Sequence, residues 1–297
     1  MDFSLTEDQQ AFAASARAFA EGAFAPNAAQ WDEESIFPKE ALRQAGELGF
    51  MGMYTPETAG GLGLSRLDAS LIVEELAKGD TATAAYLTIH NMATNMVGRY
   101  CSTAAIEEWC HALASGEKLA SYCLTEPGAG SDAASLRTSA VRDGDDYVVN
   151  GSKVFISGAG DTDVLVVMLR TGEEGPKGIS ALLIPADTAG ISYGKKEEKM
   201  GWNAQPTRLV TFDNVKVPVV NLLGNEGEGF KFAMMGLDGG RINIATCSLG
   251  TALVRFQPPD AHVHLHKEAP HEDAEFHETF RSCSQDRGGA AAPSAGR

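Results

Sequence analysis

The stretch YCLTEPGAGSD, residues 122–132, decides the fold class of this 297-residue chain. It stands near residue 120, where the apolar pattern changes from helical spacing to the alternation that is typical of strands. Gly128 and Gly130 allow the backbone to approach a ligand closely, and Thr125 and Ser131 offer hydroxyls that donate or accept hydrogen bonds. The stretch has neither the ending of a P-loop nor a G-x-G-x-x-G pattern. Chemistry alone therefore leaves two interpretations, a cofactor loop or a tight structural turn.

Helices are predicted on the N-terminal side of this stretch. Residues 6–9 have the form of a capping box, and apolar residues then recur at helical spacing from Phe12 until Pro26 ends the run. Pro38 fits a first helical position, and one face of the helix that follows is lined by Leu42, Ala45 and Leu48. Further helices are predicted over 68–77, 83–100 and 103–114. Residues 1–120 are therefore predicted to form a helical domain.

Strands are predicted on the C-terminal side. The runs 147–149 and 154–156 flank Asn150-Gly151, a dipeptide typical of hairpin turns, and further strands are expected over 164–169, 179–184 and 209–212. Residues 121–228 are thus predicted to be a β domain, and helical spacing returns over 229–253. Beyond residue 253 the apolar content falls, so residues 254–297 are expected to be a poorly ordered tail. Its alternating histidines, which we attribute to composition rather than to a metal site, are His262, His264 and His266.

Composition and charge exclude several classes of function. The formal net charge of −16, from 24 Lys and Arg against 40 Asp and Glu, argues against binding to nucleic acid. Five well-separated cysteines without a C-x-x-C pattern indicate a reduced compartment. We see no presequence and no apolar run close to the roughly 20 residues of a membrane span. We expect a cytoplasmic protein of bacterial type, or one of the mitochondrial matrix if the source is eukaryotic.

Several motifs together resemble one family. Residues 122–132 resemble the signature of the flavin-dependent acyl-CoA dehydrogenases, and NGSKVFIS at 150–157 resembles the next block of that family. The stretches GWNAQPT at 201–207, GNEGEGF at 224–230 and GGRI at 239–242 also match in order. The resemblance covers about residues 1–253. Details over 63–68, 89–92 and 237–245 look most like the isobutyryl-CoA dehydrogenase branch.

The resemblance implies a fold and an activity. The fold class would be α+β, with an N-terminal helical domain, a middle β-barrel or sandwich domain, and a C-terminal helical bundle that is mostly missing here. The activity would be FAD-dependent α,β-dehydrogenation of a short branched-chain acyl-CoA such as isobutyryl-CoA, as in valine catabolism. In that reaction a carboxylate removes the α proton while the β hydrogen passes as hydride to the flavin. The family also implies an electron-transfer flavoprotein as electron acceptor, and a homotetramer.

The resemblance assigns site residues by their position in the motifs. Cofactor binding would fall to Tyr122, Cys123, Leu124, Thr125, Glu126, Pro127, Gly128, Ala129, Gly130, Ser131, Phe155, Ile156 and Ser157. The hydroxyls of Thr125 and Ser157 would suit the pyrimidine edge of the flavin, and Phe155 would pack against its rings. Substrate binding would fall to Ser131, Asp238, Gly239, Gly240 and Arg241. For Arg241 a surface ion pair is the alternative.

The chain departs from the family pattern near Leu253. In the family, the catalytic Glu, a segment that reaches the FAD of a neighbouring subunit, and most tetramer contacts lie beyond that point. We therefore expect no catalytic base in this chain, and Glu126 is no substitute because the resemblance places it in the flavin loop. The expected tail would be an unrelated end joined to an interrupted gene. A second hypothesis follows, a truncated non-catalytic product with at most flavin or CoA affinity.

Overall fold

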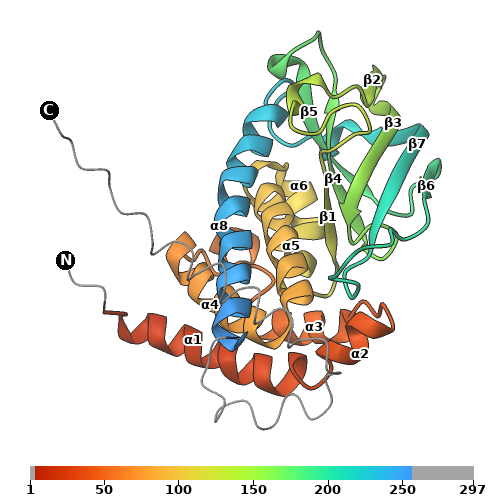
Figure 1. Ribbon diagram of the computed structural model, residues 1–297. Coiled ribbons are helices and arrows are strands. Elements are labelled where there is room, and N and C mark those ends of the chain that lie inside the picture. Colours follow the sequence, from red (N-terminus) through yellow and green to blue (C-terminus); the bar gives the residue numbers. More distant parts are fainter. Residues whose placement is uncertain (1–3, 256–297) are drawn as a thin grey trace, which may run out of the picture. The chain divides into compact units, whose positions relative to one another are not determined.

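The computed structural model describes residues 4–255, and the tail predicted over 254–297, with its histidines, lies almost wholly outside them. Helices fill the first part of the described chain (Figure 1). Helix α1 begins at the predicted capping box, in which the Thr6 hydroxyl accepts from the backbone of Gln9 and the Gln9 amide oxygen accepts from the Thr6 nitrogen. The helices are α1 (Glu7–Phe19, continued by a π-helical turn Ala20–Phe24), α2 (Ala28–Glu33), α3 (Lys39–Glu47), α4 (Arg66–Gly79), α5 (Thr81–Tyr100), α6 (Thr103–Ala105, followed by a π-helical turn Ile106–Cys110) and α7 (His111–Ala114).

In the described part of the chain, seven strands then form a single sheet with the order β1-β4-β2-β3-β7-β6, and β5 pairs with β4 outside this path. Strand β1 runs parallel to β4, whereas the pairs β2–β3, β3–β7, β4–β5 and β6–β7 are antiparallel. The strands are β1 (Ala120–Cys123), β2 (Ser139–Asp143), β3 (Asp146–Ser157), β4 (Val164–Arg170), β5 (Ile179–Pro185), β6 (Ile191–Tyr193) and β7 (Thr207–Pro218). The fold class is thus α+β, and this sheet occupies the place of the expected barrel or sandwich.

The predicted turn at Asn150-Gly151 is wrong. Both residues lie inside the twelve-residue strand β3, and the hairpin instead turns between Asp143 and Asp146, where Gly144 has a φ of +64°. Strand β7 pairs with β3 on both sides of Gly151, and the register shifts between Val149 and Gly151. The Asn-Gly dipeptide therefore marks an irregularity in a strand that its long-range partner keeps extended.

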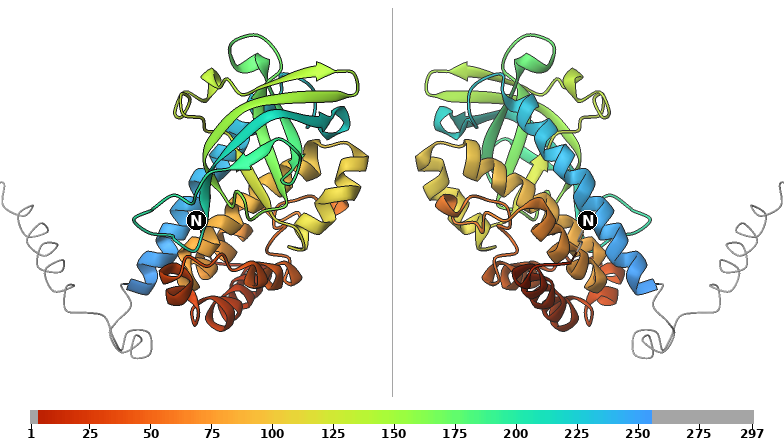
Figure 2. Two further views of the ribbon diagram at one scale, coloured as in Figure 1. Left: turned by 90° about the vertical axis from the view of Figure 1, so that its right-hand side faces the viewer. Right: turned by 90° about the vertical axis from the view of Figure 1, so that its left-hand side faces the viewer.

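Helix α8 (Gly229–Arg255) runs through Gly239 and Gly240 without a break, as a single element of 27 residues. It lies beside α5 (Figure 2). The two helices are antiparallel, because Phe232 stacks on Tyr100 with ring centroids 3.9 Å apart, while the hydroxyl of Thr251 lies 2.6 Å from that of Thr81. Packing against α5 stabilises the helix despite the low helix propensity of two adjacent glycines. Among the described residues no helix is both long and apolar enough to cross a membrane.

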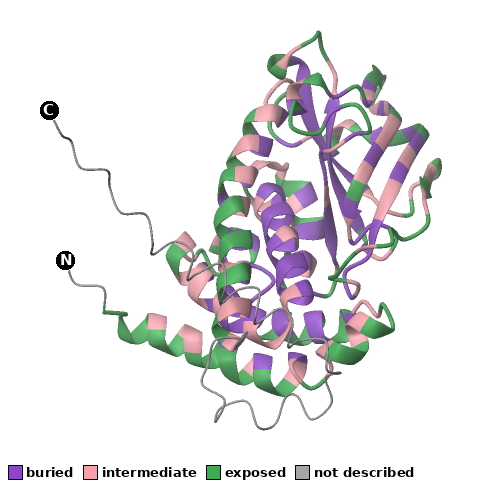
Figure 3. Cartoon of the chain, viewed as in Figure 1, coloured by how far each residue is buried: buried purple, intermediate pink, exposed green. Residues whose placement is uncertain are grey.

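The core joins the helices to the sheet. Strand β4 is buried along almost its whole length (Figure 3). Its side chains alternate between two clusters, one on each face of the sheet. Val164, Val166 and Met168 pack in one cluster with residues of α5, β1, β5 and α8, and the residues between them pack in the other with β3 and β7. Because these elements share one core, the sheet, α5 and α8 are held next to one another. Of the predicted face of α3, Leu42 and Ala45 are buried, whereas Leu48 lies past the end of the helix and is 45% exposed.

Candidate functional site

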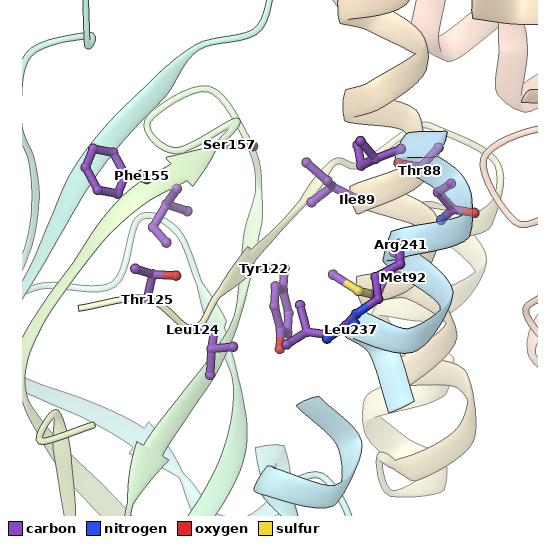
Figure 4. A pocket seen from close by; sticks show the side chains of 14 residues that line it. Thr88, Ile89, Met92, Tyr122, Leu124, Thr125, Phe155, Ser157, Leu237 and Arg241 are labelled. Carbon is purple, nitrogen blue, oxygen red and sulfur yellow. The ribbon is translucent and has the colours of Figure 1, made fainter. Parts of the chain in front are cut away.

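A cavity of about 640 Å³ lies between the sheet and helices α5 and α8 (Figure 4). Its wall on the sheet side comes from the end of β1, the stretch after it and the end of β3, and its other wall comes from the two helices. The described residues that line it are Thr88, Ile89, Met92, Tyr122, Leu124, Thr125, Phe155, Ile156, Ser157, Leu237, Gly240, Arg241, Asn243 and Ile244. The cavity therefore brings together segments that lie more than 100 positions apart in the chain.

The loop after β1 is held by its own backbone. Glu126 and Ala129 exchange reciprocal backbone hydrogen bonds of 3.0 and 3.1 Å, which close a tight turn. The backbone nitrogen of Val154 donates to the carbonyl oxygen of Thr125 over 2.9 Å, so Thr125 is tied to β3. This bond places Thr125 beside Phe155 on the same wall of the cavity (Figure 4).

Strand β3 ends in an irregularity that shapes this wall. The register against β7 shifts between Lys153 and Ile156, and Phe155 in between has a φ of +58°, which is uncommon for an aromatic residue. Phe155 is 67% exposed as a result, while Ile156 is buried. Such strain persists only where the surroundings hold it, and it is concentrated at functional sites. The bulge brings Phe155, Ile156 and Ser157 to the cavity in sequence.

Two residues assigned to the flavin by position point elsewhere. The carboxylate of Glu126 is buried in an ion pair with the ammonium of Lys153, at 2.7 Å, and accepts from the backbone nitrogens of Arg137 and Thr138 at 2.7 and 2.9 Å. Burial opposes ionisation, but the Lys153 charge and these hydrogen bonds hold the pKa of Glu126 below its usual value. Cys123 is fully buried in the sheet core, which raises its pKa to about 12. Neither side chain lines the cavity.

The remaining residues of the loop lie outside the cavity lining. Pro127, Gly128, Gly130 and Ser131 are exposed, and Ala129 is buried in the core. A Cβ built on Gly128 or Gly130 would meet nothing within 4 Å, so the outer side of this turn leaves open space. The loop therefore contributes Leu124 and Thr125 to the cavity lining.

The helix wall contains both expected and unexpected residues. Of the predicted substrate residues, Gly240 and Arg241 line the cavity, whereas Asp238 and Gly239 do not. The lining residues that sequence reasoning did not assign are Thr88, Ile89, Met92, Leu237, Asn243 and Ile244. Three of them, Thr88, Ile89 and Met92, lie on one face of α5 and were indistinguishable from core positions, because helical spacing does not reveal whether a face meets protein or a ligand.

The chemistry of the lining is apolar with a few directed polar groups. Arg241 carries the single charge among the lining residues that the structure describes. The Tyr122 hydroxyl is buried without a hydrogen-bond partner in residues 4–255, and burial raises its pKa. An unpaired buried hydroxyl costs free energy that a bound polar group would recover. No group of three or more potential metal ligands was found within the described part of the chain.

Comparison with known proteins shows which family this chain is similar to. Residues 6–117 match the family described as acyl-CoA dehydrogenase, N-terminal domain, and residues 121–215 match the acyl-CoA dehydrogenase, middle domain. A mitochondrial isobutyryl-CoA dehydrogenase of Dictyostelium discoideum is 54% identical over 265 residues, which cover 89% of this chain and 64% of that relative. The chain thus spans less than two thirds of the length of this relative.

Solved structures share the fold. Butyryl-CoA dehydrogenase from Megasphaera elsdenii superposes with a TM-score of 0.83 at 37% identity, over 97% of this chain and 77% of that one. An FAD complex of PigA superposes with a TM-score of 0.82 at 27% identity, over 86% of this chain and 67% of the other.

Proposed function

Because the chain belongs to the acyl-CoA dehydrogenase family, we propose that its cavity holds the flavin of FAD beside an acyl-CoA thioester for α,β-dehydrogenation. The family binds FAD. The substrate that we propose is a short branched-chain acyl-CoA such as isobutyryl-CoA, the compound from valine breakdown. The similarity of more than half of the residues to an enzyme of that name supports this choice. The observation that carries the proposal is the cavity itself, which family motifs from three separate segments line together.

The residues present fit a flavin. The wall from α5 and α8 carries the apolar side chains of Ile89, Met92 and Leu237, against which a planar ring system can pack. The opposite wall carries the hydroxyls of Thr125 and Ser157. The unpartnered Tyr122 hydroxyl is a further group that a polar ligand would satisfy. We propose that these three hydroxyl-bearing residues with Leu124, Phe155 and Ile156 hold the rings. The exposed turn over 127–131, where Gly128 and Gly130 leave open space, would face the rest of the cofactor or the substrate.

Bound FAD would supply a hydride acceptor. The chain itself would orient the cofactor and substrate and exclude water from them, the latter through the α5 and α8 side chains. Arg241 would offer a cation to the anionic CoA moiety in a chain of net charge −16. Removal of the α proton needs a carboxylate near the substrate. Among the described residues that line the cavity there is none, since Glu126 is buried against Lys153.

This last observation favours a second candidate function. A chain that binds FAD or CoA without turnover would need the same cavity and no carboxylate. Electron transfer to an electron-transfer flavoprotein, assembly into a tetramer, and a compartment, whether cytoplasm or mitochondrial matrix, belong with the first candidate and are likewise proposals. In the described residues the cysteines Cys101, Cys110, Cys123 and Cys247 are unpaired, which supports a reduced compartment.

A visible-absorbance experiment separates the candidates. The purified chain is mixed with FAD and passed over a gel-filtration column, and isobutyryl-CoA is then added without oxygen, with octanoyl-CoA and free CoA as controls. Dehydrogenation predicts a protein-bound flavin band that isobutyryl-CoA bleaches and free CoA does not. A band that no acyl-CoA bleaches supports the binding function alone. A colourless protein peak would contradict both.

A further inference from the structure

Ser157, at the end of β3, is hydrogen-bonded to a side chain that does not itself line the cavity. The amide nitrogen Nε2 of Gln205 donates to Oγ of Ser157 over 2.5 Å. Gln205 is only 5% exposed, and its own Oε1 has no partner among residues 4–255. A buried amide with an unsatisfied oxygen costs stability, so packing alone does not explain a glutamine at this position.

The loop that carries Gln205 is braced so that the amide is held in place. The ammonium of Lys199 donates to the carbonyl oxygens of Trp202 and Gln205, at 2.7 and 2.5 Å. The backbone and side-chain nitrogens of Asn203 donate to the carboxylate of Asp32 at 2.6 and 3.3 Å, which ties the loop to α2. Trp202 has a φ of +59°, a conformation that a non-glycine residue adopts only where its surroundings impose it.

The backbone of Ser157 is also held from both sides. Its carbonyl oxygen accepts from the hydroxyl of Ser121 at 2.7 Å, and the nitrogen of Gly158 donates to the carbonyl oxygen of Pro206 at 2.7 Å. The freedom that remains at Ser157 is the direction of its hydroxyl proton. Because Nε2 of Gln205 occupies a lone pair of Oγ, that proton is free to point into the cavity.

We propose that Gln205 is a positioning residue that makes Ser157 a hydrogen-bond donor toward the ligand in the cavity. The inference rests on the proposed function, in which this ligand is FAD, and the polar edge of a flavin offers carbonyl oxygens and ring nitrogens that accept. Gln205 would act through Ser157, without touching the cofactor. The glutamine thereby sets the direction of a hydrogen bond that a serine alone would leave undefined.

Two variants of Gln205 separate direction from packing. Gln205→Met keeps a side chain of similar length and removes the donor, so the dissociation constant for FAD rises about tenfold, the equivalent of one hydrogen bond. Gln205→Glu places an acceptor beside Ser157, which draws the serine proton away from the cavity. This variant weakens FAD binding at least as much and lowers the midpoint reduction potential of the bound flavin, because the reduced flavin loses a donor. Asn203→Ala is the matched control, since it removes the side-chain hydrogen bond of the same loop to Asp32, keeps the backbone bond, and does not touch Ser157.

The inference fails if Gln205→Glu leaves both the dissociation constant and the potential unchanged, or if Asn203→Ala reproduces the effects of Gln205→Met. A separate arm needs no flavin. Ser157→Ala lowers the melting temperature of the flavin-free chain, and it has no further effect in the Gln205→Met background, because the two side chains act as a pair. Equal effects in both backgrounds would overturn the pairing even if FAD binds. If the unaltered chain does not retain FAD, the proposed function and the proposed hydrogen bond from Ser157 to flavin are both wrong. The melting experiment without flavin would then still show whether Ser157 and Gln205 act as a pair.

Discussion

The guanidinium of Arg66 lies directly against Gly239 of α8. A Cβ on Gly239 would come within 2.4 Å of Cζ of Arg66, and the same guanidinium lies 4.2 Å from the ring centroid of Tyr54. The neighbouring Gly240 has nothing within 4 Å of its would-be Cβ, and it lines the cavity. Two adjacent glycines of one motif thus face different surroundings, one a packed cation and the other open space for a ligand.

Alanine at each of these glycines should therefore have a different effect on stability. Gly239→Ala displaces the flexible guanidinium of Arg66 and costs its contact with the ring of Tyr54, about 0.5–1 kcal/mol, which offsets most of the gain in helix propensity of about 1 kcal/mol. Gly240→Ala keeps that gain but puts a methyl group into the cavity, so unfolding free energy rises while affinity for FAD or acyl-CoA falls. Urea unfolding and ligand titration of both variants test this, each being the control of the other. Equal destabilisation by the two changes would contradict it.

Removing one partner of the buried Glu126–Lys153 pair should lower the free energy of unfolding strongly, whereas removing both charges should lower it much less. Lys153 is fully buried, and its ammonium also donates to the carbonyl oxygen of Leu124 at 3.0 Å. Glu126→Gln leaves this charge without its counter-ion and should lower the free energy of unfolding by about 3–5 kcal/mol. The double variant Glu126→Gln with Lys153→Met should recover much of the loss. Urea denaturation at pH 7 measures both, and an additive double variant would show that the two charges do not stabilise one another.

His90 should make stability fall as the solution is acidified. It is fully buried, its Nε2 lies 2.9 Å from the carbonyl oxygen of Leu113, and its Nδ1 accepts from the nitrogen of Ala120 at 3.0 Å. Burial lowers its pKa from 6.5 to about 4. Between these values the unfolded chain binds a proton that the folded chain does not, so the contribution of His90 is complete above pH 6.5. It is lost below, at about 1.4 kcal/mol per pH unit.

The measurement is the free energy of unfolding at pH 7, 6 and 5. His90→Gln should reduce the fall of the unfolding free energy between pH 7 and pH 5. His111→Gln, at an exposed position, should leave that fall unchanged. An unchanged slope in the His90 variant would assign the decline to other groups.

The outer face of α8 should promote self-association. Met235, Ile242 and Leu249 follow one another at intervals of seven residues and are 49%, 48% and 49% exposed. Residues at this spacing lie along one side of a helix, and exposed apolar groups gathered on one side tend to associate. Ile242→Lys and Leu249→Lys should each shift the chain toward the monomer in sedimentation velocity. Val141→Lys, at an exposed apolar residue of β2, is the control, and an equal shift there would mean that charge alone is responsible.

Much of the fold and part of the site could be predicted from local sequence. The capping box at Thr6, the apolar period of α5 and the run of β4 depend on residues within a few positions of one another, so the sequence by itself determined these elements. The stretch 122–132 and the end of β3 were assigned to the site through the resemblance to the family, which contiguous motifs carry.

The tertiary structure alone decided the rest. Asn150-Gly151 stays within a strand because β7, some 60 residues away, pairs with both sides of it, and that pairing outweighs a local turn preference. Glu126 does not line the cavity because its carboxylate pairs with Lys153 inside the protein, and Met92 lines the cavity from the face of α5 that packs beside α8. Contacts of this kind join residues far apart in the chain, and their free energies depend on burial and on partners that no local pattern encodes.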